Sequence, residues 1–122
     1  MEVMATRKQK LRPDLPDTLT SKANLASTYR NQGRWEAAEK LEVEVMETSK
    51  QKLGPDHPST LTSMNNLAYT CEGQGRLPEA LALMQECVRA RRDVLGAQHP
   101  HYLSSLKALH AWELKQTGAD AG

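Results

Sequence analysis

Histidines are the residues of this 122-residue chain that first suggest chemistry, because imidazole is a common metal ligand. His99 and His101 flank a single proline and could hold an ion together. His57 and His99, however, occupy the same place in two similar segments, so one structural cause explains both, and His110 stands alone. No set of cysteines and histidines has the spacing of a tetrahedral metal site. We therefore expect no metal and no cofactor.

Nucleophilic catalysis has no better support in the sequence. Serine and threonine are plentiful, but none lies in a Gly-x-Ser-x-Gly elbow, and no phosphate-binding loop is present. Cys71 and Cys87 form no disulfide pattern, and we expect buried, reduced thiols, which favours a reducing compartment. The chain is predicted not to be an enzyme.

Composition narrows the class of partner. The chain has 16 basic and 15 acidic side chains, and aromatic residues make up 4% of it. Such balance provides no field to attract a polyanion, so a nucleic acid is disfavoured. No apolar run approaches the roughly 20 residues that cross a bilayer, and the N-terminus lacks the apolar segment of a signal peptide. We expect a cytoplasmic protein without a membrane partner.

The elements that position these residues follow from an internal repeat. Residues 18–26 (TLTSKANLA) return at 60–68 (TLTSMNNLA), an offset of 60 − 18 = 42 positions. The same offset relates the His-Pro pair at 57–58 to the pair at 99–100. A fixed period of about 20 to 50 residues indicates stacked units that bury their apolar faces against their neighbours. Such proteins usually bind rather than catalyse.

Each period has the pattern of two amphipathic helices joined by a tight turn. Gly33 and Gly75 interrupt the apolar spacing, since glycine readily takes the left-handed conformation that ends a helix. Gly54 and Pro55 end the second helix, and Asp56 is expected to accept hydrogen bonds from the helix that follows. The predicted helices are 16–31, 35–53, 58–72, 77–95 and 101–116.

The pattern predicts one all-α repeat domain over residues 1–116, followed by a disordered tail at 117–122. Its about six helices should form antiparallel pairs. Arg89, Arg91 and Arg92 lie near the end of a helix, where they are expected to complement the negative pole of its dipole. The domain is predicted to consist of a partial repeat at 1–12, repeats at 16–54 and 58–96, and a partial repeat at 100–116.

These units resemble the tetratricopeptide repeat, a helix–turn–helix unit that is usually about 34 residues long. The longer period, with its Asn-Asn-Leu-Ala and Leu-Gly-x-x-His-Pro segments, is similar to the kinesin light chain type. Near-identical tandem copies also resemble the C-terminal arrays of fungal receptor proteins that carry a nucleotide-binding switch domain. The match rests on Leu25, Ala26, Tyr29, Gly33, Trp35, Ala38 and Val45, and on Leu67, Ala68, Cys71, Gly75, Leu77, Ala80 and Cys87.

The resemblance implies a right-handed superhelix (a solenoid) whose first helices line a concave groove that holds extended peptides. Asparagine suits such a groove, because its amide offers both a donor and an acceptor to a peptide backbone. These asparagines could equally bridge neighbouring helices or face water. The implied groove residues are Thr20, Asn24, Ser27, Arg30, Asn31, Thr62, Asn65, Asn66, Tyr69, Glu72 and Lys107.

The expected function is that of a protein interaction scaffold that binds a peptide or partner protein in this groove, as a fragment of a larger fungal receptor-like protein. The alternatives are a cargo adaptor of the kinesin light chain kind and a self-assembling repeat segment. Self-association is expected because the incomplete end repeats leave apolar faces without a neighbour. These faces comprise Val3, Met4 and Leu11 at one end and Leu106, Leu109 and Trp112 at the other.

Overall fold

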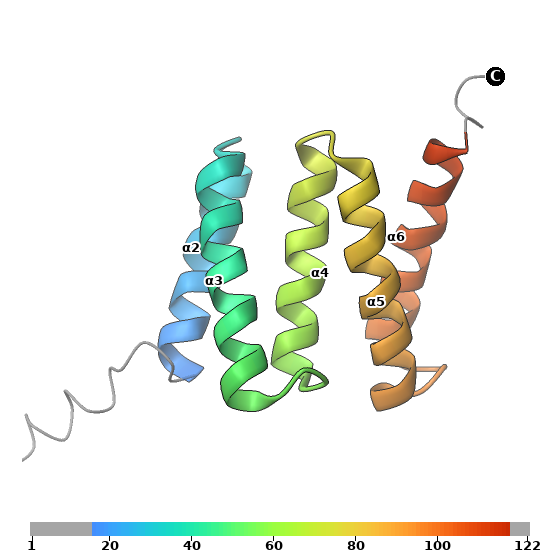
Figure 1. Ribbon diagram of the computed structural model, residues 1–122, viewed down its shortest axis with the longest axis horizontal. Helices are drawn as coiled ribbons and strands as arrows, with labels where there is room; N and C mark the ends of the chain where they lie inside the picture. Colours follow the sequence, from blue (N-terminus) through green and yellow to red (C-terminus); the bar gives the residue numbers. More distant parts are fainter. Residues whose placement is uncertain (1–15, 118–122) are drawn as a thin grey trace, which may run out of the picture.

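A computed structural model describes residues 16–117, which form α-helices and no β-strand. Successive helices run antiparallel and stand beside one another in the order of the sequence (Figure 1). The predicted all-α architecture is therefore confirmed, while the partial repeat predicted at 1–12 and all but the first residue of the tail predicted at 117–122 lie outside the described residues. The helices are α2 (Pro16–Asn31), α3 (Trp35–Leu53), α4 (Pro58–Gly73), α5 (Leu77–Leu95) and α6 (Pro100–Gln116).

Helix ends lie within one residue of the predicted positions, because the glycine turns form as expected. Gly33 has φ +78°, which places it in the left-handed region. The N–H of Arg34 donates to the carbonyl of Tyr29 at 2.8 Å, and the N–H of Gly33 donates to the carbonyl of Arg30 at 3.0 Å. This pair of bonds is the Schellman motif. It recurs at Gly75 (φ +81°), so both helix pairs turn in the same way.

The connectors between pairs explain the repeated histidines. His57 precedes α4, and its Nδ1 accepts a hydrogen bond from the N–H of Ser59 at 3.0 Å. His99 precedes α6, and its Nδ1 accepts from the N–H of His101 at the same distance. The expectation that Asp56 caps α4 is wrong. His57, one residue later, is the N-cap residue, and its imidazole accepts the hydrogen bond from a free N–H of the first turn.

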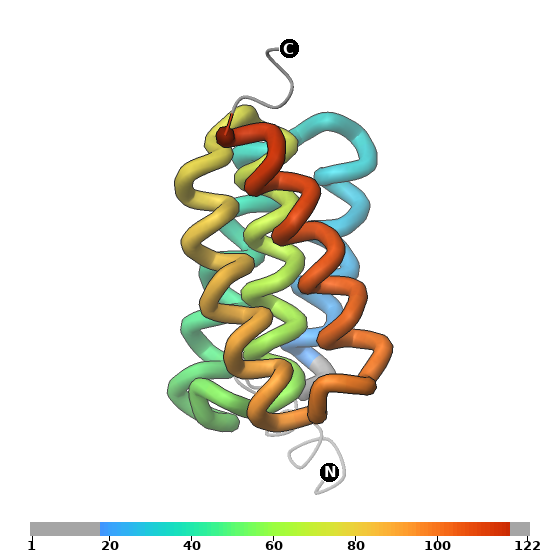
Figure 2. The backbone as a smooth tube through the Cα atoms, turned by 90° about the vertical axis from the view of Figure 1, so that its right-hand side faces the viewer, coloured from blue at the N-terminus to red at the C-terminus, as the bar shows by residue number. Residues whose placement is uncertain are grey.

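The helices form two layers. Figure 2 looks along the stack and shows α3 and α5 toward one side, with α2 and α6 toward the other. Each helix packs mainly against the next helix along the chain. Alanines lie where the two helices of a pair meet, and their lack of a long side chain lets the backbones approach closely. All four are fully buried: Ala26, Ala38, Ala68 and Ala80.

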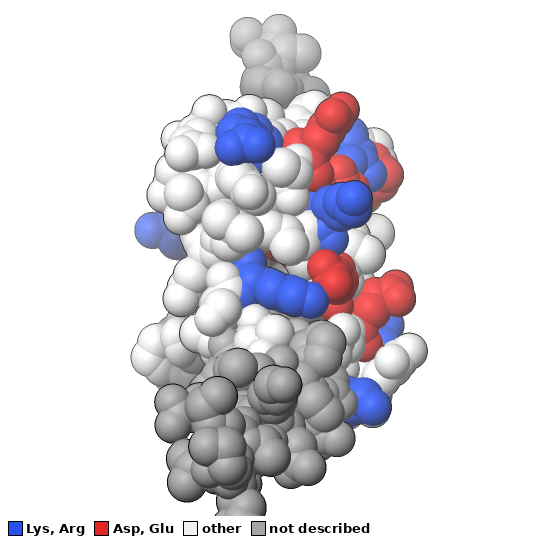
Figure 3. Space-filling view, turned by 90° about the vertical axis from the view of Figure 1, so that its left-hand side faces the viewer, with Lys and Arg blue, Asp and Glu red and all other residues white. Residues whose placement is uncertain are grey.

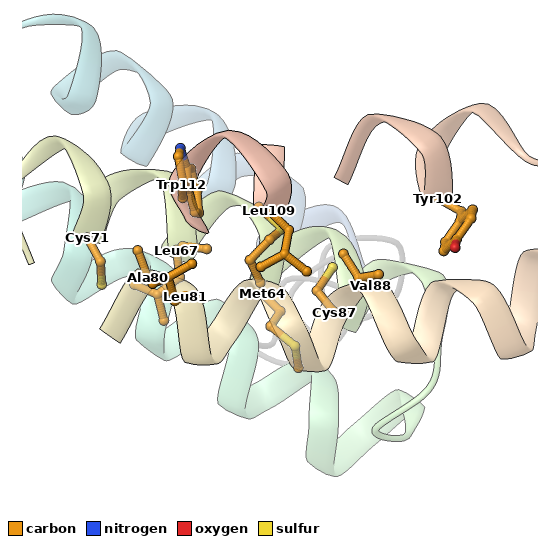
Figure 4. Close-up of a cluster of buried hydrophobic side chains, with 12 residues drawn as sticks. Met64, Leu67, Cys71, Ala80, Leu81, Cys87, Val88, Tyr102, Leu109 and Trp112 are labelled. Carbon is orange, nitrogen blue, oxygen red and sulfur yellow. The ribbon is translucent and has the colours of Figure 1, made fainter. Parts of the chain in front are cut away.

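The main hydrophobic core lies between α4, α5 and α6 (Figure 4). Cys71 and Cys87 lie in it as buried free thiols, as predicted. Leu109 and Trp112 belong to the same core, so their predicted exposure at an unpaired end is wrong. Their side chains point back toward α4 and α5 and not away from the stack (Figure 4).

One repeat position differs between the two units. Leu67 of α4 is 5% exposed, whereas its counterpart Leu25 of α2 is 43% exposed. Among the described helices, α4 packs against both the helix before it and the helix after it, whereas α2 packs mainly against α3. The position is therefore more buried where a helix packs on both sides.

The histidine cap can be tested by substitution. We expect His57→Ala to lower the free energy of unfolding by about 1 kcal/mol, because the N–H of Ser59 loses its acceptor. Chemical denaturation would measure this, and His57→Asn, which restores an acceptor, should recover most of the loss. His110→Ala, at an exposed position within α6, is the control. Equal stability of His57→Ala and the control would contradict the assignment.

Candidate binding groove

Two neighbouring hollows lie along the first helices of the repeats. The first has a volume of about 440 Å³ and lies between α2, α3 and α4, with His101 of α6 at its edge. The second has a volume of about 470 Å³ and lies between the C-terminal halves of α2 and α4, with Trp35 of α3 at its edge. Asn66 lines both hollows and joins them into one groove.

Ten of the eleven predicted groove residues line these hollows. Lys107 does not, and lies exposed on α6. The first hollow contains Thr20, Asn24, Ser27, Thr62 and Asn66, and the second contains Arg30, Asn31, Asn65, Asn66, Tyr69 and Glu72.

The asparagines of the groove have different surroundings. The Oδ1 of Asn65 accepts a hydrogen bond from the hydroxyl of Ser105 at 2.8 Å, so this side chain bridges α4 and α6. Within the described part of the chain, the side-chain amides of Asn24 and Asn66 make no hydrogen bond. Asn66 is half-buried and Asn24 is exposed. Asn24 and Asn66 are therefore the amides with donor and acceptor capacity to spare.

The rim of the second hollow is held by one aromatic contact and one ion pair. Tyr69 meets the ring of Trp112 edge to face, with centroids 5.1 Å apart. The Nζ of Lys115 lies 2.6 Å from Oε2 of Glu72, which joins α6 to α4. Tyr69 is 38% exposed and lines the second hollow.

A buried polar network supports the groove from below. Glu42 is 4% exposed, and its Oε1 accepts a hydrogen bond from the hydroxyl of Thr70 at 2.5 Å. The Nη1 of Arg30 lies 3.7 Å from Oε2 of Glu42 and donates to the backbone carbonyl of Asn66 at 3.2 Å. Burial raises the pKa of Glu42, and the bond from Thr70 and the charge of Arg30 oppose this only in part. The network ties α2, α3 and α4 together beneath the groove.

Arg91 makes contacts that sequence reasoning missed. It lies near the C-terminal end of α5, as expected, but it is 5% exposed and its guanidinium is buried inside the stack. Its Nη1 donates to the hydroxyl of Ser105 at 2.8 Å and to the carbonyl of His101 at 3.2 Å, and its Nη2 donates to the hydroxyl of Thr62 at 3.3 Å. The guanidinium therefore fills the space between α4 and α6, the counterpart of the first hollow.

Sequence reasoning also missed polar residues at the back of the first hollow, Ser49 and Ser63. Both are buried, and the hydroxyl of Ser49 has no hydrogen-bond partner among the described residues. The repeat offset could have revealed them. Ser49 and Arg91 are 42 positions apart, and so are Ser63 and Ser105. Comparing these pairs shows that the serine at 63 is repeated, whereas Ser49 is replaced by an arginine in the next unit.

The described residues can also be searched for metal ligands, reactive thiols and membrane-spanning helices. Within residues 16–117 no three histidine, cysteine or acidic side chains gather to hold a metal ion. Desolvation by burial raises the pKa of both Cys71 and Cys87, which keeps the thiols in their less reactive form. None of the described helices is long and apolar enough to pass through a membrane.

Charges of both signs mix on the surface. Figure 3 faces α2 and α3 and shows acidic and basic side chains next to one another along one edge.

A larger hollow of about 830 Å³, lined by Arg34, Trp35 and Arg76, lies at the turns. There Arg76 pairs with Glu39 at 2.8 Å and with Glu79 at 2.6 Å. Its charge is therefore already compensated, and the predicted residues lie elsewhere.

Comparison with known proteins identifies the same architecture. A family model described as tetratricopeptide repeat matches residues 14–93. No curated protein matches the chain.

Solved structures provide further matches. The nearly identical TPR-like repeats of a Podosopora anserina protein, provisionally described as a kinesin light chain, match with a TM-score of 0.73 at 29% identity, over 96% of this chain and 55% of that chain. A variant of that protein gives 0.75 with the same identity and coverage. BtubC (BKLC) from P. vanneervenii gives 0.80 at 22% identity, over 94% of this chain and 46% of that chain, which supports the fold alone. The chain thus spans about half the length of the structures it matches.

The buried carboxyl of Glu42 predicts a pH dependence of stability. Because its pKa is raised in the fold, the folded chain holds the proton more tightly than the unfolded chain. This contribution is fully present below the ordinary pKa of 4.5 and is lost as the pH rises through the raised value. The wild type should therefore lose stability relative to Glu42→Gln as the pH increases.

Urea denaturation at steps from about pH 4 to about pH 8 would measure this difference. Glu47→Gln, an exposed position on the same helix, controls for the chemistry of the change. If wild type and Glu42→Gln keep a constant difference across the range, the assigned environment of Glu42 is wrong.

Proposed function

The chain belongs to the tetratricopeptide repeat family, and we propose that it is an interaction scaffold that binds an extended segment of a partner protein along the groove of α2 and α4. The observation that carries this proposal is the gathering of ten residues from two repeats around two joined hollows. Asn66 lies at their junction with its amide unpaired within the described residues. An extended backbone presents alternating donors and acceptors, which such an amide can satisfy in pairs.

The walls of the groove suit side chains as well as backbone. Leu19, Val45 and Leu53 supply apolar surface in the first hollow, and Tyr69 supplies an aromatic edge in the second. The polar residues between them are largely uncharged. We therefore propose a peptide ligand whose affinity comes from backbone hydrogen bonds and shallow side-chain pockets, not from net charge.

The groove makes a direct binding prediction. Peptides selected from a random display library on the immobilised chain should bind Asn66→Ala about five- to tenfold more weakly than wild type, which is about 1 kcal/mol for one hydrogen-bonded amide. Isothermal titration calorimetry would measure the affinities. Gln85→Ala, exposed on α5 outside both hollows, is the matched control. If no peptide binds, or if Asn66→Ala and Gln85→Ala behave alike, the proposed site is wrong.

Self-association is a second candidate, favoured by the surface of α6. Leu103 is 46% exposed and Leu114 is 61% exposed on this last described helix, even though Leu109 and Trp112 are buried. A second copy of the chain could cover the two leucines by stacking against α6.

Sedimentation velocity over a wide concentration range tests this candidate. Assembly should increase with concentration and should be weakened by the combined changes Leu103→Glu and Leu114→Glu. The same double change is not expected to affect peptide binding at Asn66. A single monomeric species at every concentration would exclude self-association.

The parent protein sets the biological role of the scaffold. We propose a receptor-like parent because of the near-identical tandem copies, with a cargo adaptor of the kinesin light chain kind as the alternative, and we place either in the cytoplasm. Flanking coding sequence distinguishes them. A nucleotide-binding switch domain upstream would support the receptor, and a heptad coiled coil would support the motor adaptor.

A further inference from the structure

We propose that the first hollow of the groove is a pocket for an arginine side chain of the bound peptide. The inference rests on the proposed peptide-binding function and names a residue that this function would select. The evidence for it is Arg91 of this chain, whose side chain fills the equivalent space in the next repeat.

The occupied space shows what such a pocket needs. Between α4 and α6, the guanidinium of Arg91 donates to the hydroxyls of Thr62 and Ser105 and to the carbonyl of His101. All three acceptors are neutral oxygens. A forked guanidinium with five N–H donors can satisfy several acceptors that lie in different directions.

The same acceptors recur 42 positions earlier, around the first hollow. Thr20 corresponds to Thr62, Ser63 to Ser105, and the carbonyl of Ser59 to that of His101. The hydroxyl of Ser63 donates to this carbonyl of Ser59 at 3.0 Å, so a guanidinium bound there would replace that bond. The residues that line the first hollow include Thr20, Ser59 and Ser63.

The residue that would fill the hollow is missing there. Ser49 stands in the place of Arg91, and its short side chain leaves a hollow of about 440 Å³. The Ser49 side chain is 1% exposed, lines this hollow, and carries a hydroxyl without a partner among the described residues. A buried hydroxyl left unpaired is costly, so a ligand that bonds to it is favoured.

The chemistry of the lining selects the side chain. No lysine, arginine or acidic residue lines the first hollow, and His101 at its edge is the one ionisable side chain among the lining residues, so a carboxylate would meet no permanent positive charge there. Leu19, Val45 and Leu53 offer apolar walls for the methylene stem of a long side chain, whose charged end would reach the hydroxyls. An ammonium has fewer donors and is more strongly hydrated, so arginine should be preferred over lysine.

Filling the hollow from within the chain is the first test. Ser49→Arg should place a guanidinium on the oxygens of Thr20, Ser59 and Ser63, and its melting temperature should equal or exceed that of wild type. Ser49→Glu, which brings a carboxylate to the same buried position, should melt well below wild type. If Ser49→Arg is as destabilised as Ser49→Glu, the pocket does not accept a guanidinium and the proposal fails.

Peptide binding to the unaltered chain is the second test. The capped peptide Ala-Ala-Arg-Ala-Ala would be compared with its citrulline and lysine forms by nuclear magnetic resonance titration. Citrulline keeps the shape of arginine but removes its charge. We expect the arginine peptide to shift the amide signals of Thr20, Ser49 and Ser63 and to bind at least about tenfold more tightly than the citrulline form, a difference of about 1.4 kcal/mol. Ser49→Arg should abolish these shifts.

The outcomes separate this inference from the general function. Display-selected peptides that depend on Asn66 but show no preference for arginine, and that still bind Ser49→Arg, would overturn the arginine pocket and leave the groove intact. Failure of every peptide, the selected ones included, would overturn both proposals. Equal affinity of the arginine and citrulline peptides would also contradict the pocket.

Discussion

Close packing of helix backbones at four alanines is the contact on which the rest of this structure depends. Ala26 of α2 and Ala38 of α3 are both fully buried in one packed pair of helices, and Ala68 of α4 and Ala80 of α5 are fully buried in the next. Because a larger side chain at such positions would push the two backbones apart, these alanines help to set the angle and spacing of each pair. Successive pairs then place equivalent residues at equivalent heights, which brings side chains 42 positions apart into one groove.

This regularity explains what could be predicted from the sequence. Helix boundaries followed from glycines and prolines. The groove residues were implied by the resemblance to the tetratricopeptide repeat, and register carried them from one unit to the next. The contacts that were missed depend on which neighbouring group makes a hydrogen bond. His57, not Asp56, accepts the hydrogen bond from the N–H of Ser59, and Arg91 is buried because the hydroxyls of Thr62 and Ser105 accept hydrogen bonds from its guanidinium. No spacing rule contains such contacts.

The two repeats share a backbone but fill their interiors differently. Between α3 and α4 the chain buries a hydrogen-bonded carboxyl and hydroxyl, Glu42 and Thr70. One period later the same positions hold Met84 and Trp112, which lie in the hydrophobic core. An apolar pair adds stability through burial, whereas a polar pair requires a particular partner in a particular place. The buried polar pair between α3 and α4 thus favours one particular helix arrangement, whereas the apolar residues one period later mainly add stability to the fold.

The packing of each helix on its successor also bears on how the chain acquires its structure. With most contacts made between neighbours in sequence, little loop-closure entropy must be overcome, and proteins of this kind fold quickly. Among the described helices, α2 packs mainly against α3, whereas α4 packs against both α3 and α5. Local opening of the groove wall that α2 carries would therefore break one main helix–helix contact, and a ligand bound to both α2 and α4 would oppose that opening.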